Sequence, residues 1–144
     1  MTLNVKRTNP YAILPRYATA GAAAMDLSAC LDDTITLEPG ERAVVPTGIA
    51  MAIPPMHVGL LFARSGLAIN EGIALANGVG VIDSDYRGEI MVGLQNSGDA
   101  DYTVQPADRI AQMMIAPVVC PTLSFVDTLD ETERGAGGLG STGR

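Results

Sequence analysis

The chain has 144 residues, of which 47% are hydrophobic, so it is long enough to bury the core of one ordinary domain. Nine Lys and Arg residues against 16 Asp and Glu residues give a net charge of −7, which argues against a general nucleic-acid binder, since that needs a broad basic surface. The chain can still bind a phosphorylated small molecule if arginines gather locally and a divalent cation supplies further positive charge.

The N-terminus and the cysteines indicate the compartment. The first residues contain no apolar run of the kind found in secretory signals. Cys30 and Cys120 show no metal-binding or redox spacing, so we interpret them as small buried residues of a reducing compartment. Pro46, Pro54 and Pro55 interrupt the uncharged stretch 43–63, which favours two strands and a turn over a membrane helix. We expect a cytoplasmic protein without a membrane or nucleic-acid partner.

Short apolar runs bounded by Gly, Pro, Asn and Asp recur along the chain, and none shows a sustained helical period. This pattern is typical of an all-β sandwich or barrel. In chain order the expected strands are 3–6, 34–37, 42–53, 57–63, 73–81, 89–95, 102–105, 109–119 and 124–128. The runs 34–37, 73–81 and 89–95 read as apolar on both faces, so we expect one face to pack in the core and the other against a neighbouring subunit.

The first polar interruption is Asp26, within the small apolar residues 22–27 (AAAMDL). A carboxylate is costly to bury unless it is paired or hydrogen-bonded, so Asp26 is a candidate site residue. A carboxylate that caps a turn is an equally good interpretation.

One short helix is expected after Arg64, because Ser65 can cap the segment 66–71. Arg64, Ser65 and free backbone N–H groups would then share a helix N-terminus, which is a natural anion site. Serine before Gly66 is also common in ordinary turns.

Two later segments carry polar residues inside or beside apolar runs. Asp83 follows a β run and precedes a turn, where its carboxylate could lie at a pocket floor and accept a proton from water. Asp85 fits turn chemistry, and Asn77 is either an ordinary turn residue or the start of a hairpin that reads a flat heterocycle. Gln112 interrupts the strand 109–119 and is either an edge residue or a ligand contact.

The C-terminal residues 134–144 (RGAGGLGSTGR) cannot form a packed core. Glycines let backbone N–H groups approach a polyanion, hydroxyls donate hydrogen bonds, and arginine matches phosphate geometry. The segment is either a frayed terminus or a flap that closes over phosphates.

Taken together, five segments resemble the five ordered motifs of the homotrimeric dUTP diphosphatases (dUTPases): 22–27 (AAAMDL), 64–68 (RSGLA), 80–89 (GVIDSDYRGE), 108–112 (DRIAQ) and 134–143 (RGAGGLGSTG). The resemblance implies a jelly-roll-like β-barrel or sandwich over residues 1–130 and a flexible Gly-rich tail over 131–144 that closes the active site. It also implies a homotrimer with shared sites, Mg²⁺, and hydrolysis of dUTP to dUMP and pyrophosphate, which lowers dUTP and supplies dUMP for thymidylate synthesis.

The resemblance also implies residue roles. Asp83 corresponds to the base that activates the attacking water and contacts the deoxyribose, and Tyr86 to the aromatic residue packed on the sugar. The uracil hairpin contains Asn77, Gly80 and Val81. The phosphate contacts correspond to Arg64, Ser65, Gly66 and Gln112 in the body, and to Arg134, Ser141 and Thr142 in the tail. Asp26 corresponds to the carboxylate that holds Mg²⁺ through water, whereas Arg87, Asp108 and Arg109 are interpreted as structural or interfacial.

The chain departs from the family pattern at two positions. Ala63 replaces a common proline before the arginine of the second motif. Leu139 lies where the family usually has an aromatic residue over the uracil, so tail closure is expected to be weaker. The alternatives are a dCTP deaminase-like enzyme of the same fold and a non-catalytic nucleotide-binding β-roll. The deaminases are longer and lack such a tail, and the carboxylate of Asp83 together with the complete tail argues against the β-roll.

Overall fold

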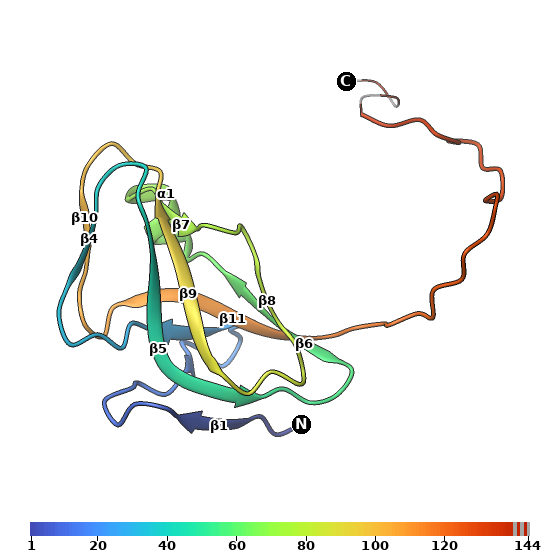
Figure 1. The fold of residues 1–144 in the computed structure, drawn as a ribbon. Coiled ribbons are helices and arrows are strands. Elements are labelled where there is room, and N and C mark those ends of the chain that lie inside the picture. Colours follow the sequence, from blue (N-terminus) through green and yellow to red (C-terminus); the bar gives the residue numbers. More distant parts are fainter. Residues whose placement is uncertain (140, 142, 144) are drawn as a thin grey trace.

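The computed structural model describes residues 1–139, 141 and 143, and its regular secondary structure is almost entirely β-strand (Figure 1). In this part of the chain the elements are β1 (Asn4–Arg7), β2 (Arg16–Tyr17), β3 (Met25–Ser28), β4 (Ile35–Leu37), β5 (Arg42–Ala52), β6 (His57–Phe62), α1 (Ser65–Asn70), β7 (Ile73–Leu75), β8 (Gly80–Ile82), β9 (Glu89–Asn96), β10 (Tyr102–Val104) and β11 (Arg109–Pro117). No helix in that part is long and apolar enough to cross a membrane.

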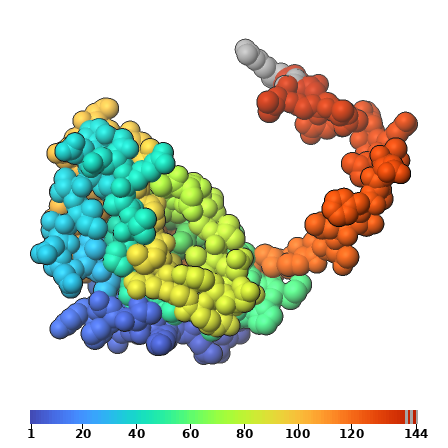
Figure 2. Space-filling model, viewed as in Figure 1, coloured from blue at the N-terminus to red at the C-terminus, as the bar shows by residue number. Residues whose placement is uncertain are grey.

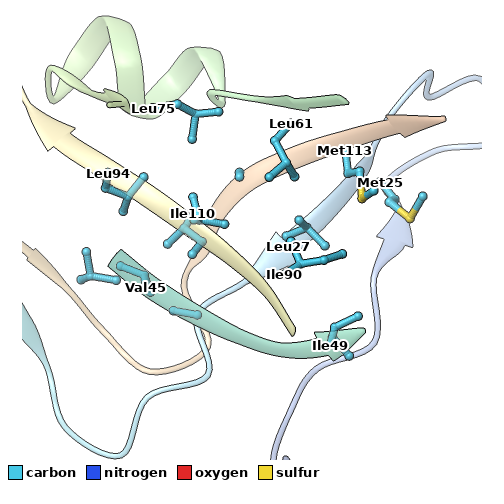
Figure 3. Packing of buried hydrophobic residues seen from close by; sticks show 14 of the residues in the cluster. Met25, Leu27, Val45, Ile49, Leu61, Leu75, Ile90, Leu94, Ile110 and Met113 are labelled. Carbon is cyan, nitrogen blue, oxygen red and sulfur yellow. The ribbon is translucent and has the colours of Figure 1, made fainter. Parts of the chain in front are cut away.

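Two antiparallel sheets pack face to face. One has the strand order β1-β5-β9-β7 and the other the order β2-β3-β11-β6-β8, while β10 and β4 form a short separate ribbon. Apolar side chains from both sheets fill the space between them (Figure 3). The expected all-β jelly-roll sandwich with one short helix is confirmed.

The alternating pattern of β9 shows how the sequence builds this core. Ile90, Val92 and Leu94 point inward and are buried, because successive side chains of a strand point to opposite faces. Met91, on the opposite face, is 41% exposed. Val44 is also exposed, on the paired strand β5, where its register partner is Gly93. Apolar side chains thus lie on the outside of this sheet, as expected for 89–95.

The structure corrects several expected elements. The run 73–81 is two strands, since a tight turn at Asn77 and Gly78 sends β7 into one sheet and β8 into the other. The segment around Asp26 is strand β3, although its small residues gave no strand signal. The expected strand 34–37 is not apolar on both faces, because Thr36 points outward and its hydroxyl bonds that of Thr103. No strand forms at 124–128 in the structure.

Beyond β11 the chain leaves the body and runs away from it (Figures 1 and 2). We call residues 118–130 the arm and residues 131–144 the tail. Five apolar side chains of the arm are exposed, and Phe125 is 99% exposed; the five are Val119, Leu123, Phe125, Val126 and Leu129. Burying these side chains would be favourable, but in a single chain they stay exposed to solvent.

Candidate active site

A pocket of about 240 Å³ lies where β8 ends. It is lined by Val81, Ile82, Asp83, Tyr86, Glu89 and Met91. Asp83 directly follows β8, and its carbonyl accepts a hydrogen bond of 3.2 Å from the Tyr86 N–H, which closes the turn. The structure therefore brings the expected base and the expected sugar contact to one pocket, with an exposed carboxylate at its edge.

The turn that precedes β8 presents backbone groups beside this pocket. Gly78 has φ +72°, a conformation that L side chains rarely adopt, and its N–H donates to the Leu75 carbonyl. Gly80 is buried, and a Cβ there would lie 2.9 Å from atoms of Leu61. Asn77 is exposed in this turn, so its side chain is free of the core. A Cβ at Gly78 would meet nothing within 4 Å, so the turn is open and its backbone groups are accessible to a flat ring.

A second group of candidates lies on strands β3 and β11 and just after β6, in the sheet that also contains β8. Strand register places Asp26, Gln112 and Phe62 side by side on β3, β11 and β6. The Gln112 side-chain amide donates a 2.9 Å hydrogen bond to the Ala63 carbonyl. Gln112 is therefore not an edge residue but a central one that holds the chain just before Arg64.

Asp26 is held by two guanidinium groups. Its Oδ1 accepts from Arg64 Nε at 3.2 Å and its Oδ2 accepts from Arg109 Nη1 at 3.0 Å, with the Asp26 side chain 13% exposed. Arg64 Nη1 also donates to the Arg109 carbonyl at 3.2 Å. Asp26 thus orients Arg64 from within a strand rather than capping a turn. The structural role expected for Arg109 is this pairing, which sequence spacing could not reveal.

Helix α1 follows Arg64 and is short and without buried residues. It begins at Ser65, so Arg64 rather than Ser65 occupies the capping position, and no side chain caps the helix. Arg64 keeps an extended backbone because its side chain reaches back to Asp26. The expectation that Ser65 caps the helix is therefore wrong, and the Ala68 N–H instead donates to the Arg64 carbonyl at 2.9 Å.

The donor set around Asp26 suits only a metal ion that keeps its waters. No group of three or more His, Cys, Asp or Glu side chains is gathered among residues 1–139, 141 and 143. A carboxylate offers about four acceptor positions, and the two arginines occupy one on each oxygen. The remaining positions can accept hydrogen bonds from the waters of Mg²⁺, which is commonly held by one or two carboxylates and substrate phosphates.

The two groups of residues lie apart within one chain. Strand register pairs Ile82 of β8 with Gly59 of β6, so Asp83 lies opposite Val58. Val58 is four residues before Phe62, the β6 residue that pairs with Gln112 beside Asp26. Four residues span about 13 Å along a strand. In the described part of the chain, moreover, the lining of the Asp83 pocket holds two carboxylates and no basic side chain. One chain therefore presents its candidate residues in two separate groups, which we call the Asp83 half-site and the Asp26 half-site.

The tail candidates lie outside both half-sites. Leu139 is fully exposed, and Ser141 is exposed as well. Arg134 donates from Nε to the Gly137 carbonyl at 3.0 Å, a contact within the tail itself. Thr142 lies outside the described residues. The structure therefore brings none of the described tail residues to the Asp83 pocket of its own chain (Figure 2).

The cysteines differ from expectation and from each other. Cys120 lies in the arm and is exposed, not buried. Cys30 is half-buried, and burial raises the pKa of its thiol, with the carboxylates of Glu89 and Asp32 raising it further. A thiol held protonated is a poor nucleophile, so Cys30 fits no catalytic role.

Comparisons with known proteins agree with this geometry. A dUTPase family model matches residues 10–143. The deoxyuridine 5'-triphosphate nucleotidohydrolase of Desulfitobacterium hafniense (strain DSM 10664 / DCB-2) is 56% identical over 131 residues, covering 90% of this chain and 87% of the relative. That of Syntrophotalea carbinolica is 50% identical over 143 residues, covering 99% and 97%.

Solved structures give the same result. The dUTPase of Staphylococcus bacteriophage 80alpha with dUPNHPP matches with a TM-score of 0.90 at 29% identity, covering 99% of both chains. The dUTPase of the S. aureus phage phi11 matches with a TM-score of 0.83 at 25% identity, covering 92% of this chain and all of that one. Since the family model spans nearly the whole chain and contains every candidate residue of both half-sites, the chain belongs to the dUTPase family.

Proposed function

We propose that this chain hydrolyses dUTP to dUMP and pyrophosphate. The observation that carries the proposal is the pocket at the end of β8, which Asp83 and Tyr86 line together. Membership of the dUTPase family and the names of relatives at 50–56% identity support it. The activity lowers dUTP and provides dUMP.

Asp83 is the general base of this reaction. Its exposed carboxylate accepts a proton from a water molecule, and the water oxygen bonds to the α-phosphorus while the bond to the bridging oxygen of the β-phosphate breaks. Pyrophosphate leaves with that bonding electron pair. Arg64 and Gln112, with the N–H groups of Ser65 and Gly66, stabilise the negative charge on the phosphates.

Substrate selection rests on the half-site around β8. Uracil lies against the turn that contains Asn77, with Gly80 and Val81 beyond it, and it is read largely by backbone groups. The Tyr86 ring packs on deoxyribose and leaves no room for a 2′-hydroxyl. A steric wall rejects an added hydroxyl more strongly than a hydrogen-bond donor does.

Mg²⁺ is the cofactor in this proposal. Asp26 holds it through water, and the ion neutralises charge on the triphosphate when bound. Because Asp26 is also paired to Arg64 and Arg109, its carboxylate serves two purposes, and chelation of Mg²⁺ should abolish turnover while leaving the arginine pairs intact.

The active form is a homotrimer with shared sites. The separation of the two half-sites, about 13 Å along the sheet, supports this assembly. The described residues that line the Asp83 half-site also include no basic side chain to bind phosphate. The exposed apolar arm offers area to bury against another copy. Sedimentation should show a trimer, and a folded monomer with full activity would contradict this assembly.

The tail, residues 131–144, closes the site over bound dUTP. Arg134, Ser141 and Thr142 contact the β- and γ-phosphates, and Leu139 covers the uracil without stacking on it. Closure by one tail over another copy's site suits the position of the tail away from its own body (Figure 1).

One experiment separates this activity from its alternatives. The chain is incubated with dUTP and with dCTP in separate samples containing Mg²⁺, and pyrophosphate and ammonia are assayed. The expected result is pyrophosphate in the dUTP sample and neither product in the dCTP sample. Ammonia from dCTP would indicate a deaminase of the same fold, and binding of dUTP without either product would indicate a non-catalytic β-roll.

A further inference from the structure

The ring of Tyr86 is held in place by the residues that follow it in the chain. We infer that Gly88 and Glu89 are positioning residues which fix this ring and thereby set the preference for deoxyribose over ribose. The inference rests on the proposed function, in which Tyr86 packs on the sugar.

Gly88 provides the space that the ring occupies. A Cβ built at Gly88 would lie 2.5 Å from Cζ and 2.9 Å from Cε2 of Tyr86, and it would also overlap the hydroxyl oxygen. Carbon atoms need about 3.5 Å or more between them, so the ring could not stay where it is. The backbone of Gly88 does not itself demand glycine, because its φ lies outside the left-handed region. The requirement is therefore one of space for the ring.

Glu89 ties the ring to the sheet. The Tyr86 hydroxyl donates a 2.9 Å hydrogen bond to the Glu89 carbonyl at the start of β9. The Glu89 carboxylate Oε1 in turn accepts a 2.7 Å hydrogen bond from the N–H of Gly48. A charged acceptor makes this one of the stronger hydrogen bonds of the chain.

The far end of this connection is rigid. Gly48 lies at the irregularity of β5 with φ +67°, and a Cβ there would come within 2.6 Å of Ala12 and 2.9 Å of Cys30. Beside it, the buried hydroxyl of Thr47 donates to the Ile90 carbonyl at 2.7 Å. The connection from Tyr86 through Glu89 to Gly48 thus ends in tightly packed sheet rather than in a surface turn.

A ring fixed in this way can act as a wall. Although Tyr86 is 43% exposed in a turn, its hydroxyl is held by a hydrogen bond and the Cζ and Cε2 atoms of its ring lie against Gly88. A ring that could tilt by a small amount would make room for a 2′-hydroxyl, and steric discrimination would be lost. Rejection of UTP therefore depends on Gly88 and Glu89, which hold the ring in place.

The test is a double-mutant cycle in the full chain, read as the ratio of kcat/KM for dUTP to kcat/KM for UTP. Gly88→Ala should lower this ratio about tenfold. In a Tyr86→Ala background the same substitution should change it less than about twofold, because the ring is already gone. Gly21→Ala is the matched control, since a Cβ there meets nothing within 4 Å.

Glu89 is tested by rescue. Glu89→Ala should lower the ratio because the Gly48 N–H loses its acceptor, whereas Glu89→Gln keeps a side-chain oxygen and should retain most of the selectivity. Thermal melting of each variant identifies loss of fold, which lowers both kcat/KM values together and leaves their ratio unchanged.

Two results would overturn the inference: an unchanged ratio in Gly88→Ala, or an equal fall in the presence and absence of the Tyr86 ring. A crystal structure of Gly88→Ala gives a readout independent of activity. A displaced ring with a broken Tyr86–Glu89 hydrogen bond supports the positioning role of Gly88 even if the wild-type chain fails to hydrolyse dUTP, and an undisplaced ring refutes that role. Absence of pyrophosphate from dUTP in the wild type would instead refute the proposed function.

Discussion

The body of the chain and its arm and tail hold their apolar side chains in opposite ways. In the body, two sheets bury residues such as Val45, Ile90 and Ile110 almost completely (Figure 3). In the arm, Phe125 and Leu129 have nothing to pack on, and the described residues of the tail make hydrogen bonds only with one another. The body therefore has a packed apolar core of its own, whereas the arm exposes apolar side chains that another copy can cover.

This difference separates two contributions to activity. In the proposed reaction the body supplies the base and the ring that excludes ribose, both on a rigid frame, which is how precise geometry is kept. In the same proposal the tail supplies charge and closure on a segment that must also release product. Variants confined to one region should leave the function of the other intact.

The largest effect should come from the body. Asp83→Asn removes the proton acceptor but keeps the shape of the side chain, so turnover should fall by about 10²–10⁴-fold. The carboxylate is exposed, so the fold and the binding of a non-hydrolysable dUTP analogue should persist. Steady-state kinetics and calorimetry on the same sample measure both; near-normal turnover would remove Asp83 from the mechanism.

Deletion of residues after Glu133 tests the tail with the body left whole. The fold should survive because the removed residues bury little apolar area. Turnover should fall by about 10²-fold, since the phosphates lose the groups that hold them in line for attack. Circular dichroism checks the fold, and the rate of pyrophosphate release checks the turnover. A truncated chain as fast as the intact one would show that the tail is only a frayed end.

Leu139→Phe sharpens the contribution of the tail. An aromatic ring can stack on uracil where leucine can only cover it, and a ring pair contributes about 0.5–1.5 kcal/mol. A non-hydrolysable dUTP analogue should then bind several-fold tighter, with kcat unchanged or slightly lower if opening limits release. Leu139→Met, which adds no ring, is the control, and equal gains from both would argue against stacking.

The smallest expected effect lies in the body, at Ala107. This residue has φ +71° at the second central position of the turn that begins at Gln105, where an L side chain is strained. Ala107→Gly should raise the free energy of unfolding by about 0.5–1 kcal/mol, the relief of strain less the added entropy of glycine. Thermal melting should shift upward by a few degrees with turnover unchanged; a lower melting temperature would contradict the strain.

The sequence predicted the fold class because alternation of apolar residues is local information, as in β9. It also supplied the candidate residues of both half-sites, because the five motifs are short and ordered, and the roles of these residues stay predictions. It could not show that the Asn77 turn divides one apolar run between two sheets, since both halves read as one strand. Nor could it show the pairing of Asp26 with Arg64 and Arg109, which depends on strand register between distant segments.

The central claim is that one site draws its base and its closing tail from different copies of the chain, and subunit mixing tests it most directly. Full-length Asp83→Asn and a wild-type chain truncated after Glu133 are each nearly inactive alone in this account. After joint dissociation and reassembly, about one quarter of the sites should pair an intact Asp83 with an intact tail, the product of two even chances. Activity near that fraction of wild type is the predicted result, and a mixture no more active than its separate components would contradict the claim.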